Sequence, residues 1–267
     1  MEMEAVARRG LVLLGCGKMG SALLAGWLKA GLPADAVHVI EPHPSEWLSA
    51  TGVQLNATPP ADPAVAMIAV KPQMMDAALP TLAPGPETLV LSIAAGTPIS
   101  AFDSRFGAVP VIRAMPNTPA AVGRGITAIV GNAQAGEDHL ALAEALLSAV
   151  GEVVRLERES QMDAVTGTSG SGPAYVFHMV EALAAAAEEQ GLAPDLAMRL
   201  ARATVSGAGA LLDASDESAA QLRVNVTSPQ GTTAAGLSVL MADPGGLTQL
   251  MTRTVEAAAA RSRALGG

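Results

Sequence analysis

The sequence predicts a doubly wound α/β domain followed by an all-helical domain, on the basis of three observations. Short apolar runs alternate with helical patterns through the first part of the chain, and a glycine-rich turn follows the first run. After about residue 160 the β-branched runs stop and Ala-rich helical patterns replace them. Alternation of strand and helix is typical of a parallel sheet with helices on both faces.

The strands of the first domain are expected where the chain is short, β-branched and apolar on both faces, as in a covered parallel sheet. The runs that meet this description are residues 11–15, 37–41, 65–70, 88–94 and 109–115. Crossover helices are expected between them, at 18–31, 45–52, 72–85 and 98–107. A last strand–helix–strand unit is expected from strands 124–132 and 152–157 around a helix at 137–151.

The second domain is expected to be helical throughout, with Pro near the helix starts and Gly at the ends. Its expected helices are 173–192, 194–215, 229–246 and a last one within 247–267. We therefore expect a dinucleotide-binding domain at 1–160 and a helical substrate and dimerisation domain at 161–267. Helices with so many small and apolar side chains need a partner surface, which predicts packing against a second copy of the chain.

Composition excludes several classes of function. The formal net charge is −9 and only 2% of the 267 residues are aromatic, which argues against a nucleic-acid partner because phosphate binding needs Lys and Arg. Cys16 is the single cysteine, and no Cys/His cluster has metal-ligand spacing, so no metal is expected. No apolar run approaches about 18 residues and the first ten residues make a poor secretory signal, so a cytoplasmic protein without a membrane span is expected.

The glycine-rich turn "GCGKMG" indicates a dinucleotide site. The segment comprises Gly15, Gly17, Lys18, Met19 and Gly20, directly after the first strand and at the start of the first crossover helix. In such a turn the first Gly permits the tight bend, the second admits a pyrophosphate and the third lets the helix pack on the strand. The alternative is an ordinary Gly-rich turn, which the strand–turn–helix context disfavours.

Glu41 ends the second strand about 20 residues after this turn, where a carboxylate can bind the ribose 2′-hydroxyl of NAD and repel the 2′-phosphate of NADP. NADH is therefore favoured over NADPH, and both stay open. The alternative is that Glu41 only faces water at the end of its strand.

Six phrases in one order make the chain similar to pyrroline-5-carboxylate reductases. They are "GCGKMG" (15–20), "AVKPQ" (69–73), "SIAAGT" (92–97), "RAMPNTPA" (113–120), "TSGSGPAYVF" (168–177) and "VTSPQGTTAAGL" (226–237). The resemblance implies a Rossmann domain, a helical dimerisation domain, active sites at the dimer interface and further assembly of dimers. It also implies hydride transfer from NAD(P)H to the C=N carbon of 1-pyrroline-5-carboxylate, giving L-proline.

The resemblance further implies roles for individual residues. Those implied at the dinucleotide are Ala69, Val70, Lys71, Pro72, Ala94, Ala95, Gly96, Met115 and Asn117. Those implied around the substrate are Ser171, Gly172, Pro173, Gly231, Thr232 and Thr233. Thr233 is implied to meet the ring nitrogen, as the one catalytic side chain. The chain departs from the family pattern at Gln230, where Gly is common, and in "EPHP" after the second strand, so cofactor preference does not carry over.

The chemistry does not require a strong acid, because a protonated imine is already an electrophile and the hydride comes from the cofactor. Lysine occurs only at 18, 29 and 71, so a lysine acid on a C-terminal helix is excluded. Lys71 is expected at the cofactor edge, and His178 is expected to be a core histidine rather than an acid. The remaining alternatives are a reductase of another cyclic imine or small keto compound, and a non-catalytic dinucleotide sensor.

Overall fold

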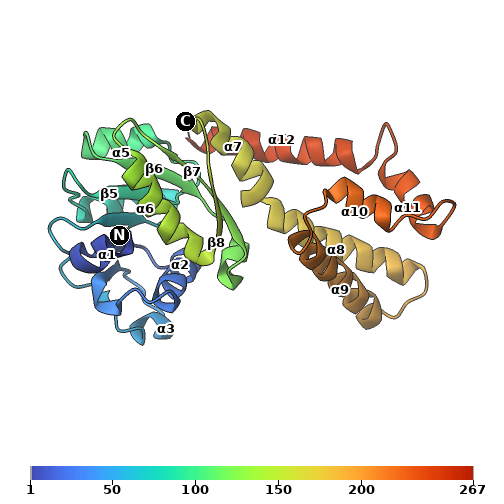
Figure 1. Ribbon diagram of the computed structural model, residues 1–267, viewed down its shortest axis with the longest axis horizontal. Helices are drawn as coiled ribbons and strands as arrows, with labels where there is room; N and C mark the ends of the chain where they lie inside the picture. The colour runs from blue at the N-terminus through green and yellow to red at the C-terminus, as the bar shows by residue number, and fades with distance from the viewer. Residues whose placement is uncertain (1, 267) are drawn as a thin grey trace. The chain divides into compact units, whose positions relative to one another are not determined.

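The computed structural model describes residues 2–266 and divides them into two compact units (Figure 1). The first unit comprises residues 2–171 and 258–266, and the second comprises residues 172–257. Residues 161–171 therefore group with the first unit. The expected domain ranges, 1–160 and 161–267, stay a prediction. The outer ends of those ranges, residues 1 and 267, lie outside the described residues.

An eight-stranded sheet forms the centre of the first unit, with the order β3-β2-β1-β4-β5-β6-β7-β8 in residues 2–266. Its neighbouring strands are parallel except β6 and β7, which are antiparallel. The strands are β1 (Leu11–Leu14), β2 (Val37–Ile40), β3 (Gln54–Leu55), β4 (Val65–Ile68), β5 (Leu89–Ser92), β6 (Val111–Met115), β7 (Gly125–Gly131) and β8 (Gly151–Arg155).

Helices cover both faces of this sheet, because alternate side chains of each strand enter one of two separate cores. Leu11 and Leu13 of β1 join a core with Trp27, whereas Val12 and Leu14 join another with Phe102. The first core is closed by α1 (Glu2–Arg9), α2 (Lys18–Lys29), α3 (Glu46–Ser49) and α6 (Glu137–Leu147). The second is closed by α4 (Met75–Ala78), α5 (Ile99–Phe106) and α7 (Met162–Val165). The predicted doubly wound, Rossmann-like domain is thus confirmed.

All seven expected strands are present, and the differences from expectation have local causes. The segment between β6 and β7 holds only a 3₁₀-helix, Thr118–Val122, so the chain reverses direction instead of crossing over. The expected helix at 72–85 shrinks to α4 between two 3₁₀ turns, since Pro80 and Pro84 cannot continue a helix. Helix α1 and the two-residue strand β3 were not expected.

The second unit is entirely helical, as the sequence predicts. It contains α8 (Gly172–Glu189), α9 (Pro194–Asp213), α10 (Ala219–Asn225), α11 (Thr232–Leu240) and the first part of α12 (Leu247–Gly266). The helix expected at 229–246 begins only at Thr232, after a turn that Gly231 N–H closes onto the Ser228 carbonyl at 3.1 Å. Helix α10 was not expected. Large apolar side chains such as Phe177 and Val239 are 63% and 72% exposed in the single chain, which fits a helical unit that packs against another copy.

Candidate active site

The glycine-rich turn after β1 has the backbone that its three glycines predict. Gly15 adopts φ +87°, and a Cβ there would lie 2.7 Å from Val70 Cγ1 and 3.1 Å from the Ala69 carbonyl. A Cβ on Gly20 would lie 2.7 Å from the Gly15 carbonyl oxygen. The fold thus brings the turn against the end of β4, and both glycines are needed for that close approach.

Gly17 has the opposite environment, because no atom lies within 4 Å of the place where its Cβ would stand. It is the N-cap residue of α2, and no side chain caps the helix start there. The space in front of Gly17 is therefore open, and the N–H groups of the first turn of α2 border it. Lys18 is exposed at the same helix start and Met19 is half-buried. This arrangement suits a pyrophosphate, which the positive end of a helix dipole stabilises.

Glu41 is hydrogen-bonded to the glycine-rich turn. Its two carboxylate oxygens accept the backbone N–H of Cys16 at 2.8 Å and of His43 at 3.0 Å. Asn56, at φ +51°, holds the Glu41 backbone in turn: Asn56 Oδ1 accepts its N–H and Asn56 Nδ2 donates to its carbonyl. Each carboxylate oxygen keeps a free lone pair for a ribose hydroxyl. Asn56 was not expected to matter, and only the tolerance of asparagine for positive φ could have indicated it.

The Cys16 thiol is buried in this turn. Burial raises its pKa above the ordinary value, so the thiol stays protonated near neutral pH. Ser21 fixes the turn from the following helix by donating its hydroxyl to the Cys16 carbonyl at 2.9 Å.

The sheet order places a ligand crevice at this turn. Strand β1 lies between β2 and β4, so the chain winds away from β1 in both directions and the switch point lies between β1 and β4. Ligands of open parallel sheets bind at the carboxyl ends of the strands at such a point. The open cradle at Gly17, the close-packed Gly15 and Gly20, and the acidic side chain at the end of β2 together fit a dinucleotide.

The other residues expected at the dinucleotide follow the carboxyl ends of β4, β5 and β6. Ala69 and Val70 contact the positions of Gly15 and Gly20, whereas Lys71 and Pro72 are exposed at the start of the 3₁₀-helix Pro72–Met74. Ala94, Ala95 and Gly96 form the loop after β5, and Gly96 has φ +73°. The side chain of Asn117 is buried and accepts the backbone N–H of Ile126 on β7 at 2.9 Å, which fixes the chain reversal.

Met115, at the end of β6, packs on the segment that leads into the helical unit. A Cβ on Gly170 would lie 2.6 Å from Met115 Cε. Gly170 ends a π-helical turn, Thr166–Gly170, that joins α7 to α8, and the Ser171 N–H bonds to the Thr166 carbonyl at 2.9 Å. Such turns are frequent at functional sites. Ser171, Gly172 and Pro173 follow directly along the chain and are half-buried.

The loop before α11 has no ionisable side chain, and it ends in an open helix start. Gly231 is the N-cap residue, no side chain caps the helix, and Thr232 and Thr233 are exposed in its first turn. Gln230 has φ +57°, a conformation that favours glycine. A Cβ on Gly231 would clash with Ser228 Oγ and would lie 3.2 Å from the Ser228 carbonyl oxygen, which explains the glycine at this position.

His178 is not the core histidine that the sequence suggested. Its side chain is 81% exposed in the single chain and its Nδ1 lies 3.0 Å from Glu181 Oε2, one turn further along α8. The apolar residues around it on α8 are themselves exposed, so local hydrophobicity did not indicate burial within one chain.

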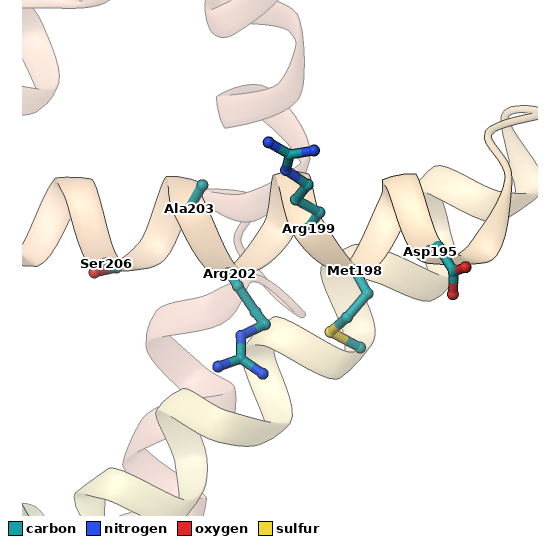
Figure 2. Close-up of a pocket in the computed structure, with 6 residues that line it drawn as sticks. All are labelled: Asp195, Met198, Arg199, Arg202, Ala203 and Ser206. Atoms are coloured by element: carbon teal, nitrogen blue, oxygen red, sulfur yellow. The ribbon is translucent and has the colours of Figure 1, made fainter.

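A hollow on α9 contains none of the expected site residues. It has a volume of about 510 Å³ and is lined by Asp195, Met198, Arg199, Arg202, Ala203 and Ser206. Figure 2 shows that the guanidinium groups of Arg199 and Arg202 point away from one another, so they do not converge on a common anion.

Over residues 2–266, no group of three or more His, Cys, Asp or Glu could hold a metal ion. None of the described helices is long and apolar enough to cross a membrane.

Comparison with known proteins identifies the family. The model for pyrroline-5-carboxylate reductase dimerisation matches residues 159–265, and the model for NADP oxidoreductases that are coenzyme F420-dependent matches residues 10–96. The pyrroline-5-carboxylate reductase of Synechocystis is 43% identical over 266 residues, covering 96% of this chain and 98% of the relative. That of Pseudomonas aeruginosa is 38% identical over 264 residues, covering 96% of both. The chain belongs to the pyrroline-5-carboxylate reductase family.

Solved reductases of this family share its fold over the whole chain. The pyrroline-5-carboxylate reductase of Coxiella burnetii has a TM-score of 0.89 at 31% identity, and covers 97% of this chain and 99% of its own. The reductase of Plasmodium falciparum, solved with NADP bound, has a TM-score of 0.81 at 27% identity, with 97% and 98% covered. The dimerisation model spans the helical unit, which supports a homo-oligomer that acts on a small molecule.

Glu159 and Arg113 connect two elements that border the candidate site, and neither residue was expected to matter there. The carboxylate of Glu159 accepts the N–H of Ile99, at the start of α5, and Nη1 of the buried Arg113, at 2.9 and 2.8 Å. It thereby ties the helix that follows the loop after β5 to the strand that ends at Met115. The sequence carries no local signal for this pairing, because the partners are far apart in the chain.

Proposed function

We propose that this protein reduces 1-pyrroline-5-carboxylate to L-proline, the last step of proline biosynthesis, with NAD(P)H as reductant. Membership of the family supports the reaction. One structural observation carries the assignment of the substrate site: the segment 227–233 forms a turn and an uncapped helix start without an ionisable side chain. Such a helix start offers backbone N–H groups to the substrate carboxylate. It has no acidic or basic side chain, and the reaction needs none because the hydride comes from the cofactor.

The cofactor is held by the turn after β1. Gly15 and Gly20 set its shape, Gly17 leaves room for the pyrophosphate, and Glu41 binds the adenosine ribose. When bound, NAD(P)H supplies the hydride for the C=N carbon of the substrate. Because Glu41 is anionic and would repel a 2′-phosphate, we propose a preference for NADH.

The protein's own contribution is binding, orientation and one hydrogen bond. Ser171, Gly172 and Pro173 enclose the substrate ring at the start of α8, and Gly231 and Thr232 hold its carboxylate with backbone N–H groups. Thr233 hydrogen-bonds to the ring nitrogen through its hydroxyl: a protonated imine keeps its N–H when the hydride reaches the carbon, and an unprotonated imine needs a proton relayed from water. Positioning of the reacting atoms contributes to the acceleration in such a site, because it holds the cofactor and the C=N carbon in reacting geometry.

The proposal extends to the oligomeric state, the cellular location and the partners of the protein. The helical units of two copies pack together, dimers associate further, and the protein works in the cytoplasm without a nucleic-acid or membrane partner. Light scattering at micromolar concentration tests the first point, since a stable monomer would contradict it.

The test of function is the oxidation of NADH and NADPH, followed by absorbance, with pyrroline-5-carboxylate and with a six-membered cyclic imine carboxylate. The proposal expects faster turnover of the five-membered ring. Turnover of the six-membered ring alone would assign a different imine, and binding of NADH without turnover of either ring would assign a sensor.

A further inference from the structure

The loop after β5 is covered by the last turn of the chain's final helix. Gly96 is buried in this loop, and a Cβ on it would lie 3.1 Å from Leu265 Cβ and 3.5 Å from the Leu265 carbonyl. A Cβ on Gly266 would lie 2.7 Å from the Gly96 carbonyl oxygen. The backbones of the loop and of the helix end are thus in contact, with no room for a methyl group between them.

The end of α12 is fixed by more than this contact. The hydroxyl of Ser262, which is 5% exposed, donates to Asp163 Oδ1 at 2.6 Å, and Ala259 is 7% exposed. Ala259, Ser262 and Gly266 recur at the spacing of one helix face, so small residues let the helix end approach closely. Asp163 belongs to α7, whose Met162 packs in the same core as Ile99 and Phe102 of α5. The end of α12 is therefore bonded to α7, and α7 packs on α5, the helix that follows the loop after β5.

The topology gives this loop a place along the dinucleotide. The glycine-rich turn follows β1, and Glu41 follows β2 on one side of it; β4 and β5 lie on the other side. With the pyrophosphate at the turn and the adenosine ribose at Glu41, the nicotinamide half extends over the carboxyl ends of β4 and β5. Residues 94–96 border that half. A displacement of their backbone should therefore weaken binding of the nicotinamide and leave binding of the adenosine unchanged.

We propose that the last turn of α12 positions the nicotinamide: Leu265 and Gly266 hold the backbone of Gly96 in place, and the loop that contains Gly96 supports the ring. This rests on the proposed dinucleotide function. Gly266 acts through the loop and is a positioning residue. A side chain at 266 displaces the Gly96 carbonyl and with it the loop, whereas removal of the last turn leaves the loop unsupported.

The test compares two ligands in the full-length protein. Calorimetry gives the affinity for NADH and for ADP-ribose, which lacks the nicotinamide. Gly266→Val is expected to weaken NADH binding by about tenfold, because a small displacement of a positioning group costs this much or more. ADP-ribose binding should change by less than about twofold, which also shows that the nucleotide-binding unit is folded. Ala264→Val, which puts the same side chain at an exposed position of the same turn, should change neither affinity.

A second variant guards against overpacking by the new valine. A chain that ends at residue 264 lacks the contact without added volume, and it should also lose NADH affinity while keeping ADP-ribose affinity. Equal losses for both ligands in both variants, or wild-type NADH affinity in either one, would overturn the proposal. A wild-type protein that binds ADP-ribose as tightly as NADH would show that the nicotinamide adds no affinity, which would also overturn this proposal; failure of the proposed function would show instead as absence of turnover.

Discussion

The carboxylate of Glu41 accepts a hydrogen bond of 2.8 Å from the backbone N–H of Cys16, and so joins the end of β2 to the glycine-rich turn after β1. Glu41 therefore has two separable properties: a negative charge at the expected ribose position and an acceptor that holds the turn in shape. Both bear on the choice between NADH and NADPH, but only the charge repels a 2′-phosphate.

Replacing Glu41 should change cofactor preference through the charge. Glu41→Ser is expected to raise the NADPH-to-NADH ratio of kcat/KM by about tenfold, since a charge pair near the surface is worth roughly 1 kcal/mol or more. Steady-state kinetics with both cofactors measure it. Glu41→Gln is the matched variant, because an amide oxygen can still accept the Cys16 N–H. It should raise the ratio as well, and an unchanged ratio in both variants would refute a role for the charge.

Thr233 should matter for turnover and not for cofactor binding. Thr233→Val keeps the shape of the side chain and removes the hydroxyl, so kcat with pyrroline-5-carboxylate should fall by about tenfold to a hundredfold, in the range of one lost hydrogen bond to a reacting group. NADH affinity, measured by fluorescence titration, should stay near wild type. Thr232→Val serves as the control, because Thr232 is assigned to backbone binding only. A wild-type kcat in Thr233→Val would exclude Thr233 as the partner of the ring nitrogen.

Gln230 occupies a backbone conformation that suits glycine. At φ +57° a β-branched residue is strained, so Gln230→Val should lower the free energy of unfolding by about 1–2 kcal/mol. Gln230→Gly should be close to neutral, because relief of strain offsets the greater freedom of glycine in the unfolded chain. Denaturant unfolding of both variants measures the difference. Equal stabilities would mean that the loop adapts its backbone to the residue at 230.

His38 should make the protein less stable in mild acid. Burial lowers its pKa from the ordinary 6.5, and its Nδ1 is buried with no hydrogen-bond partner among the described residues. Below the unfolded-state pKa the unfolded chain takes up a proton that the folded chain resists, so stability is lost as pH falls from about 7.5 to 5.5.

The variant His38→Gln removes the titration and should flatten this dependence by at most about 1.4 kcal/mol per pH unit. Free energies of unfolding at the two ends of the range, for wild type and variant, give the comparison. Parallel pH profiles would show that His38 contributes nothing to the acid sensitivity.

Features that depend on local pattern could be predicted from the sequence. Apolar β-branched runs marked the strands because a strand buried on both faces must be apolar throughout, and β1, β4 and β5 lie within the predicted ranges. Gly15, Gly17 and Gly20 were identified by spacing: glycine permits the bend at Gly15 and the close packing at Gly20, and Gly17 leaves the space in front of the helix start open. The turn-forming residues of 227–231 likewise predicted a turn there, although the helix that follows begins at Thr232 and not at residue 229.

Features that join distant parts of the chain could be seen only in the folded structure. No local pattern shows that Glu41 bonds to Cys16, that Glu159 pairs with the buried Arg113, or that Gly266 contacts Gly96. The reversal of β7 depended on the absence of a crossover helix, and the exposure of His178 depended on which apolar faces stay open in one chain. Hydrogen bonds and close contacts between distant residues are set by the packing of whole elements, and that packing is not written in any short stretch of sequence.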